Sequence, residues 1–210
     1  MSTDHESDLN LRGLIHDLNN VFQTILDAAD LLAKDPKWAA LAGNIERTAE
    51  RGHRLSHSIS EATRSTFDLH VIAEIAIQFA RDFLYATKHH PIKFHCDIPC
   101  GFRLRGNPVA WERALVNLLL NSAQAMPDGG WVKLSATAVG AKATIRVEDN
   151  GPGIPAEILA RIFEPHFSTK PANSGLGLHI VKSLVEHDGG IVSAHNRAEG
   201  GAGFLIEARC

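Results

Sequence analysis

The sequence has few cysteines, no long apolar run and only a small excess of negative charge. Three cysteines among 210 residues are too few for the disulfide framework of a small secreted protein. No apolar stretch is long enough to cross a bilayer, and no signal-peptide pattern is present. The 21 lysines and arginines are scattered and are outnumbered by 24 aspartates and glutamates, which argues against binding to nucleic acid. We therefore expect a cytoplasmic protein with no membrane segment.

The cysteines also raise the question of a metal site. Cys96 and Cys100 lie close to His89, His90 and His95. Their spacing matches no common zinc pattern. Reduced cysteines in and after a strand are the interpretation we favour.

Hydrophobic residues make up 44% of the chain, enough for a real core, and in the first 65 residues they recur at steps of three and four. Such a pattern predicts amphipathic helices. Its members are Leu11, Leu14, Leu18, Val21, Ile25, Ala28 and Leu32, then Trp38, Leu41, Ile45, Thr48, Gly52, Leu55, Ile59 and Ala62. The stretch Lys34–Lys37 separates the two helices. Two helices cannot bury such stripes well alone, so we expect residues 1–65 to form a hairpin that pairs with a second copy into a four-helix bundle.

Residues 66–210 show a different pattern. It predicts helices at 68–87, 108–125, 155–162 and 175–187, and strands at 92–96, 132–136, 145–147, 191–195 and 204–208. Asn107 and Pro108 suit the N-cap and the first residue of the second of these helices. Helices on one face of a mixed, largely antiparallel sheet form an α/β sandwich. The expected fold class is therefore α+β, with the domain boundary between residues 65 and 66.

Two glycine motifs in this second part are the most informative feature of the chain. Asp149-Asn-Gly151-Pro-Gly153 ends a predicted strand, and Gly175-Leu176-Gly177-Leu178 opens a predicted helix. Glycine tolerates positive φ and allows the backbone to come close to a ligand. A helix N-terminus offers free N–H donors to phosphate, and Asp149 offers an acceptor to an exocyclic amine such as that of adenine. Together the two motifs indicate a nucleotide site.

A histidine on the first predicted helix is the candidate reactive residue. His16 lies two residues after a position of the apolar stripe, and is therefore turned about 200° away from it. Asp17 is beside it and Asn20 is one turn further on. A solvated helix face is the simpler interpretation for any one of the twelve histidines. The combination of His-Asp-Leu-Asn-Asn with a dimerising hairpin and a nucleotide site favours His16.

In these features the sequence resembles bacterial sensor histidine kinases of two-component systems, whose ATPase domain belongs to the gyrase, Hsp90, histidine kinase and MutL superfamily. Five segments, covering nearly the whole chain in the family's order, carry the resemblance. They are His16–Asn20 for the phosphoacceptor box, Asn117–Ala123 for the asparagine box, Asp149–Gly153 for the first glycine box, Phe163–Lys170 for the phenylalanine box and Gly175–Leu178 for the second glycine box. Any one of them alone would be weak evidence.

The resemblance implies roles for the residues of the phosphoacceptor box. His16 would attack the γ-phosphate of ATP as a neutral imidazole, and Asp17 would hold its tautomer or take its proton. Asn20 would support dephosphorylation of a response regulator by orienting a water. The expected partners are a second copy of the chain and a response regulator receiver domain.

It also implies roles in the nucleotide site. Asn121 would bind Mg²⁺ through its amide oxygen, and Asn117 would support the phosphates or the metal. Asp149 would read the adenine amine while Gly151 and Gly153 allow close approach. The helix start Gly175–Leu178 and Lys170 would meet the phosphate charge. The implied cofactors are ATP and Mg²⁺.

The sequence departs from the family pattern at several points. Val21 stands where many relatives have proline, and Gln124 replaces a basic residue. Fewer than ten residues precede the first predicted helix, so we expect no sensor domain, and any sensor would be a separate protein. The competing functions are an ATP-independent dimeric histidine phosphotransferase and a serine kinase of the anti-sigma-factor type. Intact glycine and asparagine boxes argue against the first, and the outward His-Asp pair argues against the second.

Overall fold

The computed structural model describes residues 65–87, 90–169 and 175–210, together with single residues and short stretches between 21 and 52. Residues 65–168 and 175–210 form one compact unit, and the described residues between 21 and 52 belong to another. Several residues singled out above lie outside the described part. They are His16, Asp17, Asn20, His89 and Lys170, together with the apolar positions before residue 21 and after residue 52.

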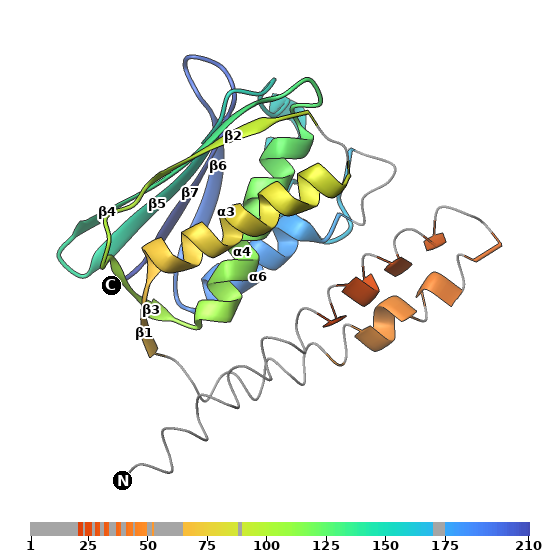
Figure 1. The fold of residues 1–210 in the computed structure, drawn as a ribbon, viewed down its shortest axis with the longest axis horizontal. Helices are drawn as coiled ribbons and strands as arrows, with labels where there is room; N and C mark the ends of the chain where they lie inside the picture. Colours follow the sequence, from red (N-terminus) through yellow and green to blue (C-terminus); the bar gives the residue numbers. More distant parts are fainter. Residues whose placement is uncertain are drawn as a thin grey trace, which may run out of the picture. The chain divides into compact units, whose positions relative to one another are not determined.

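The larger unit contains one main sheet with helices packed against it (Figure 1). Its elements are β1 (Ser65–Asp68), α3 (Leu69–Ala86), β2 (Ile92–Asp97), β3 (Arg103–Gly106), α4 (Pro108–Gln124), β4 (Gly130–Val139), β5 (Lys142–Asp149), α5 (Ala156–Leu159), α6 (Gly177–His187), β6 (Ile191–Asn196) and β7 (Ala202–Arg209). The main sheet has the strand order β2-β4-β5-β7-β6, and β1 pairs with β3 in a separate two-stranded sheet.

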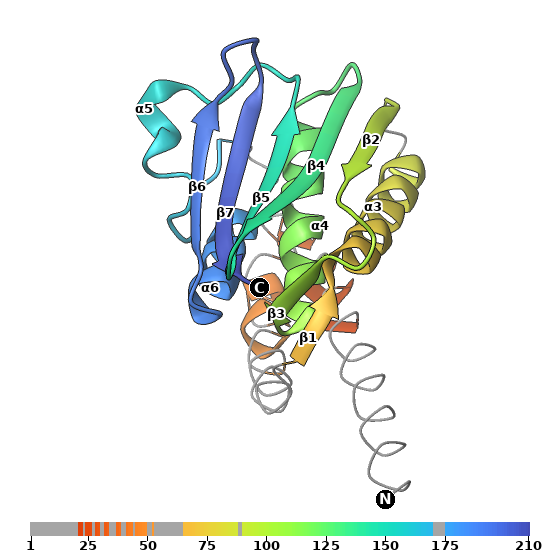
Figure 2. The same cartoon turned by 90° about the vertical axis from the view of Figure 1, so that its left-hand side faces the viewer.

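The main sheet is mixed, as predicted, and largely antiparallel. Only β2 and β4 pair in parallel; β4 with β5, β5 with β7 and β6 with β7 are antiparallel. Helices α3, α4 and α6 lie on one face, and the opposite face is uncovered by helices within the described residues (Figure 2). The prediction of an α+β fold with helices on one face of a mixed sheet is confirmed for this unit.

Alternation along the central strands builds the core. In β5, Ala143, Ile145 and Val147 are buried while the residues between them are half-exposed, because successive side chains of a strand point to opposite faces. The register places Ile145 opposite Ile206 and Val147 opposite Phe204 of β7, both buried. Asp149 is the next residue in this inward-facing row, so the strand carries a carboxylate to the helix-covered face of the sheet.

The start of α4 follows the predicted capping chemistry. The Asn107 side chain accepts hydrogen bonds from the backbone N–H groups of Val109, at 3.0 Å, and Ala110, at 3.4 Å, with Pro108 as the first helical residue. The apolar face of α4, including Leu115, Leu118 and Leu119, is fully buried. This anchoring orients the rest of the helix, and with it the asparagines near its C-terminal end.

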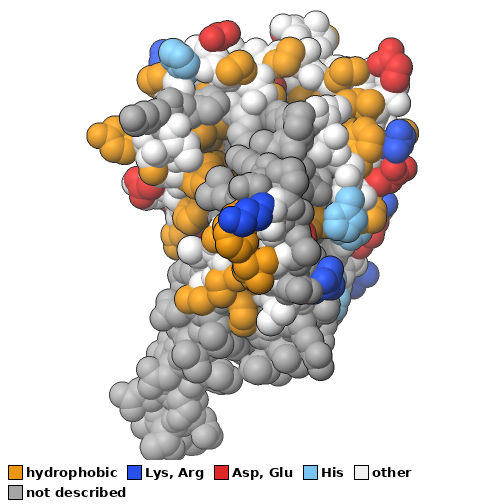
Figure 3. Space-filling view, turned by 90° about the vertical axis from the view of Figure 1, so that its right-hand side faces the viewer, with side chains coloured by type: hydrophobic (Ala, Val, Ile, Leu, Met, Phe, Trp, Pro, Cys, Tyr) orange, Lys and Arg blue, Asp and Glu red, His pale blue; other side chains and the backbone are white. Residues whose placement is uncertain are grey.

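Some elements differ from the predictions. Strands β1 and β3 were not predicted, because four residues are too few to show a clear alternation. Helix α5 is shorter than predicted, with bounds Ala156–Leu159, and α6 begins at Gly177, two residues later than predicted. Among the described residues no helix is long and apolar enough to cross a membrane. On the face drawn in Figure 3, described basic and acidic side chains are interspersed with apolar ones.

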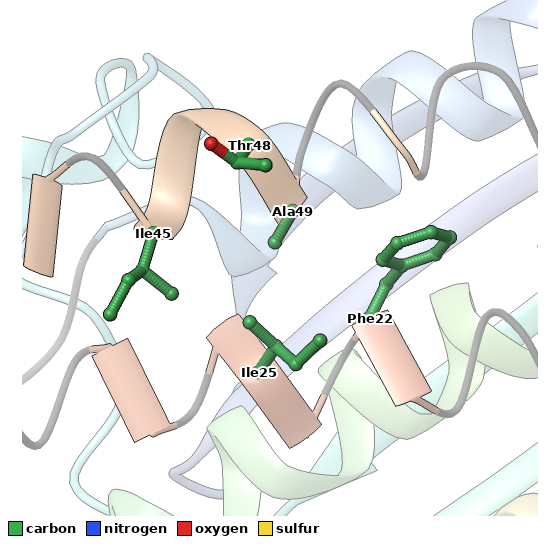
Figure 4. Close-up of a pocket in the computed structure, with 5 residues that line it drawn as sticks. All are labelled: Phe22, Ile25, Ile45, Thr48 and Ala49. Carbon is green, nitrogen blue, oxygen red and sulfur yellow. The ribbon is translucent and has the colours of Figure 1, made fainter.

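The described residues between 21 and 52 include helical stretches with two sets of apolar positions. Phe22, Ile25, Ile45, Thr48 and Ala49 line an apolar pocket of about 280 Å³. In Figure 4, Ile25 points toward the segment that carries Ile45 and Ala49. Other positions of the predicted stripes are exposed: Val21, Ala28, Leu32, Trp38 and Leu41. Each segment therefore has an inner apolar row and an outer one, whereas the sequence pattern predicted a single stripe for each helix.

Candidate nucleotide site

The Asp149 carboxylate is the buried polar centre of the site. Only 2% of the residue is exposed. Its Oδ1 accepts hydrogen bonds from the backbone N–H groups of Gly151, at 2.9 Å, and Ala202, at 3.0 Å. Buried carboxylates need such partners because burial without them is costly. Both bonds reach the same oxygen, and within the described part of the chain none reaches Oδ2. The arrangement therefore fixes one oxygen and leaves an acceptor on the other.

The glycines after Asp149 are required by the packing of the protein itself. Gly153 has φ +79°, and a Cβ there would lie 2.9 Å from the side-chain oxygen of Asn196. A Cβ on Gly151 would lie 3.0 Å from Cγ of Met126. The sequence argument assigned both glycines to close approach of a ligand. The structure supplies a second reason, which is that the loop is pressed against its own neighbours.

Two asparagines of α4 lie one turn apart on one side of the helix. Asn117 donates a hydrogen bond from Nδ2 to the backbone oxygen of Arg113, at 3.0 Å. The Oδ1 atom of Asn117 then points toward α6, and a Cβ added to Gly177 would lie 3.3 Å from it. The Asn121 side chain is half-buried and makes no hydrogen bond with any described residue. The structure thus brings Asn117 to the start of α6 and leaves the amide of Asn121 available.

The N-terminus of α6 completes the described part of the site. Its N-cap residue, Leu176, makes no side-chain cap hydrogen bond, so among the described residues no side chain caps the N–H groups of the first turn. Leu178 packs against the core. Gly175 has φ +71°, and a Cβ there would lie within 2.7 Å of the backbone of His166 and Phe167. The second glycine motif therefore holds the helix start close against the phenylalanine-containing segment.

That segment is tied to the core and to α6. Phe163 and Phe167 are half-buried and pack against the core, and the guanidinium of Arg161 lies 4.6 Å from the centre of the Phe167 ring. On α6, the ring Nδ1–H of His179 donates to the backbone oxygen of Phe163, at 3.2 Å. These contacts fit the role of anchors at the two sides of a loop whose residues 170–174 lie outside the described part.

The sequence argument missed the contribution of the β6–β7 hairpin. Asn196 and Arg197 bond to the Asp149–Ile154 segment, and Ala202 donates to Asp149. The pair Gly200-Gly201 is a turn signal that could have placed a hairpin here. No local signal could have shown that the hairpin lies beside residues more than 40 positions earlier.

The cysteines lie apart from this chemistry. Burial raises the pKa of the Cys96 thiol to about 11, helped by the nearby Glu74 carboxylate and opposed by a hydrogen bond from the backbone at Ile98. Cys100 is exposed. Within the described residues, no three histidine, cysteine or acidic side chains are grouped so that they could hold a metal ion.

Comparisons with known proteins agree with this architecture. Residues 106–209 match the family described as histidine kinase-, DNA gyrase B- and HSP90-like ATPase. The chain is 29% identical to the sensor kinase CckA of Brucella abortus over 92% of its own length and 23% of that protein. It is also 29% identical to the sensor histidine kinase ZraS of Klebsiella oxytoca, over 92% of its own length and 44% of that protein. The chain thus spans less than half of these relatives.

Solved structures show the same fold. The mycobacterial sensor histidine kinase MprB superposes with a TM-score of 0.62 at 26% identity, covering 70% of this chain and 97% of that one. The catalytic domain of the histidine kinase ThkA gives the same TM-score and identity, covering 70% of this chain and 95% of the other. The chain therefore contains a histidine-kinase-type ATPase domain of the family shared with DNA gyrase B and HSP90, in a sequence similar to sensor histidine kinases.

Proposed function

We propose that this chain is a two-component histidine kinase that phosphorylates His16 from ATP and passes the phosphoryl group to an aspartate of a response regulator. The observation that carries the proposal is the buried Asp149 carboxylate, which is held on one oxygen by two backbone N–H groups in a domain of this ATPase family. An acceptor oxygen in a buried position favours a base that presents an exocyclic amine. We therefore assign adenine to the Asp149 end.

The other end of the site fits the triphosphate and a magnesium ion. Asn121 offers an amide oxygen with no described partner, which is a suitable hard ligand for Mg²⁺. When bound, the ion would neutralise phosphate charge. Asn117 and the N–H groups of Gly175–Leu178 at the start of α6 would face the phosphates, because a helix N-terminus favours anions. Lys170 would add a positive charge from the adjoining loop.

The reaction itself requires a nucleophile from the first part of the chain. We assign this role to His16, whose neutral imidazole would form an N–P bond to the γ-phosphorus as the bond to the β-phosphate oxygen breaks and ADP leaves. Asp17 would hold the ring or take its proton. Because ATP and receiver domains are found inside the cell, the proposal places this reaction in the bacterial cytoplasm.

Dimerisation through residues 1–65 is part of the proposal, with residues 66–210 as the catalytic ATP-binding domain. The outer apolar row supports it: Val21 is 53% exposed and Leu41 46% exposed, although both belong to helical segments whose inner row already faces a pocket. A second copy would cover these side chains in a four-helix bundle. The mass measured by light scattering would test this part of the proposal.

The experiment that tests the proposed function is incubation with γ-labelled ATP followed by acid treatment. The parent protein should take up acid-labile label, typical of phosphohistidine, and His16→Gln should reduce it at least about 100-fold while nucleotide binding is retained. His57→Gln is the matched control, since that histidine has no adjacent acid, and it should label normally. Acid-stable label would instead indicate a serine kinase, and no label on the parent would indicate an ATP-independent phosphotransferase.

The same label can be followed onward to the response regulator. After transfer to a receiver domain, loss of label to free phosphate should be slower with Asn20→Ala than with the parent, because we assign the water-orienting role to Asn20. Equal rates of loss would leave the kinase assignment standing and remove the phosphatase role.

A further inference from the structure

The β6–β7 hairpin holds the loop Asp149–Ile154 at both of its ends. The loop leaves β5 at Asp149 and runs through the glycine turn to Ile154. At its first end it is bonded to Arg197 and Ala202, and at its last end to Asn196. Because β7 pairs directly with β5 and β6 pairs with β7, the hairpin is anchored to the same sheet that supplies Asp149.

At the last end, Asn196 pairs with both backbone polar groups of Ile154. The Ile154 N–H donates to Asn196 Oδ1 at 2.7 Å, and Asn196 Nδ2 donates to the Ile154 oxygen at 2.7 Å. The side-chain amide pairs with Ile154 as the backbone of a neighbouring strand would, since it bonds to both the N–H and the C=O group of that residue. The bonds are short for N–H···O contacts, and the bare Cα of Gly153 makes room for the amide oxygen.

At the first end, Arg197 bonds to the backbone oxygen of Asp149, at 2.9 Å. Four features hold the guanidinium in place. It donates to the Gly200 oxygen at 3.0 Å, pairs with the Glu148 carboxylate at 3.4 Å, pairs with Glu199 at 3.5 Å, and lies 4.8 Å from the centre of the Trp131 ring. Its side chain is only 16% exposed. An arginine held on so many sides acts as a rigid support rather than a mobile surface charge.

We propose that Asn196 and Arg197 are positioning residues for recognition of the adenine base, which they serve through the loop Asp149–Ile154 without touching the nucleotide. The inference rests on the proposed function, because it takes Asp149 as the residue that reads the base. Arg197 fixes the backbone from which the carboxylate projects, and Asn196 fixes the far side of the turn. Together they set the direction of Oδ2, and a hydrogen bond of the required length depends on that direction.

This role differs from general stabilisation in what it predicts. If the hairpin sets the direction of the Asp149 carboxylate, its loss weakens the contact to the base and leaves the phosphate contacts unchanged. Asn121 and the start of α6 are separate elements that the hairpin does not bond to within the described residues. The affinity for adenine and the ratio of adenine affinity to 6-oxo purine affinity should then fall together. Simple destabilisation would leave this ratio unchanged.

The sharpest variant is Asn196→Asp, which has almost the same shape. It keeps an oxygen to accept from the Ile154 N–H but replaces the Nδ2 donor by an oxygen that faces the Ile154 carbonyl oxygen. Affinities for ATP, inosine triphosphate and inorganic tripolyphosphate are measured by calorimetry on the full chain, beside melting temperature. We expect about tenfold weaker ATP binding, a comparable fall in the ratio of ATP to inosine triphosphate affinity, and unchanged tripolyphosphate binding.

A second pair of variants guards against misfolding and tests the other end. Arg197→Ala should show the same pattern as Asn196→Asp, and Arg197→Lys should recover part of the ratio, since a lysine can still donate to the Asp149 oxygen. Ser193→Ala is the matched control, because Ser193 is an exposed residue of the same strand β6 and takes no part in the hydrogen bonds to the loop Asp149–Ile154. It should bind all three ligands as the parent does.

The outcomes separate this inference from the proposed function. Parent protein that fails to bind ATP would overturn both. If the parent binds ATP and Asp149→Asn weakens it, but folded Asn196→Asp and Arg197→Ala keep the parent's affinity ratio, only the positioning role is overturned. A uniform loss for all three ligands would also overturn it, since it would indicate a structural role alone.

Discussion

The two ends of the candidate site are built differently. At the proposed adenine end, Asp149 is bonded to two backbone N–H groups, and the loop that follows it is held by Asn196 and Arg197. At the proposed phosphate end, within the described residues, the Asn121 side chain has no hydrogen-bond partner and no side chain caps the first turn of α6. Under the proposed function, a prebuilt surface would read the base, whereas the phosphate end would rely on groups that the ligand and its metal satisfy.

The largest effect should come from Asn121→Ala at the open end. If Asn121 binds Mg²⁺, its removal should slow autophosphorylation by about 100-fold or more, while ADP binding measured without metal changes little. Asn121→Asp is the matched control, since it keeps an oxygen ligand and should retain more activity than the alanine variant. A radiolabelled phosphorylation time course checks both. Equal losses of metal-free ADP binding and activity would contradict the separation of the two ends.

An intermediate effect is expected from Asp149→Asn at the prebuilt end. Asparagine can keep Oδ1 bonded to the N–H groups of Gly151 and Ala202 but would present an NH₂ donor in place of Oδ2. ATP affinity should fall by about 1–3 kcal/mol, and inosine triphosphate, whose 6-oxo group is an acceptor, should gain relative to ATP. Competition titrations with the two nucleotides measure this ratio. An unchanged preference would remove Asp149 as the residue that reads the base.

The smallest effect should come from Gly177→Ala. The added Cβ would lie 3.3 Å from Asn117 Oδ1, a contact that a small movement relieves, and alanine favours helix over glycine by about 1 kcal/mol. ATP affinity should therefore change by less than about threefold. Gly201→Ala is its counterpart at the other end, where φ is +91° and the Cβ would overlap the Asp149 backbone oxygen. Thermal melts and binding titrations should show a severe loss for Gly201→Ala alone, and similar losses for both would weaken the comparison.

Much of the larger unit could be predicted from the sequence because its signals are local. The cap at Asn107 and Pro108 and the apolar row of β5 each depend on residues within a turn or a strand. The glycine motifs were found in the same way. Asn117 and Asn121 came from the resemblance to sensor histidine kinases, and the structure brings Asn117 to the start of α6. The short strands β1 and β3 were not predicted. The two apolar rows between residues 21 and 52 were predicted as one stripe, because heptad spacing does not distinguish adjacent rows.

By itself, the sequence determined the order of the longer helices and strands, the burial of alternate residues in β5, and the placing of a carboxylate at its end. Tertiary structure alone decided what holds that carboxylate. The bonds from Asn196 and Arg197 join residues 42 and 48 positions apart, and they exist because β7 and then β6 lie beside β5. Local patterns encode the period of each strand, but the order of strands in a sheet follows from packing the whole chain, and it is this order that brings the hairpin to the loop.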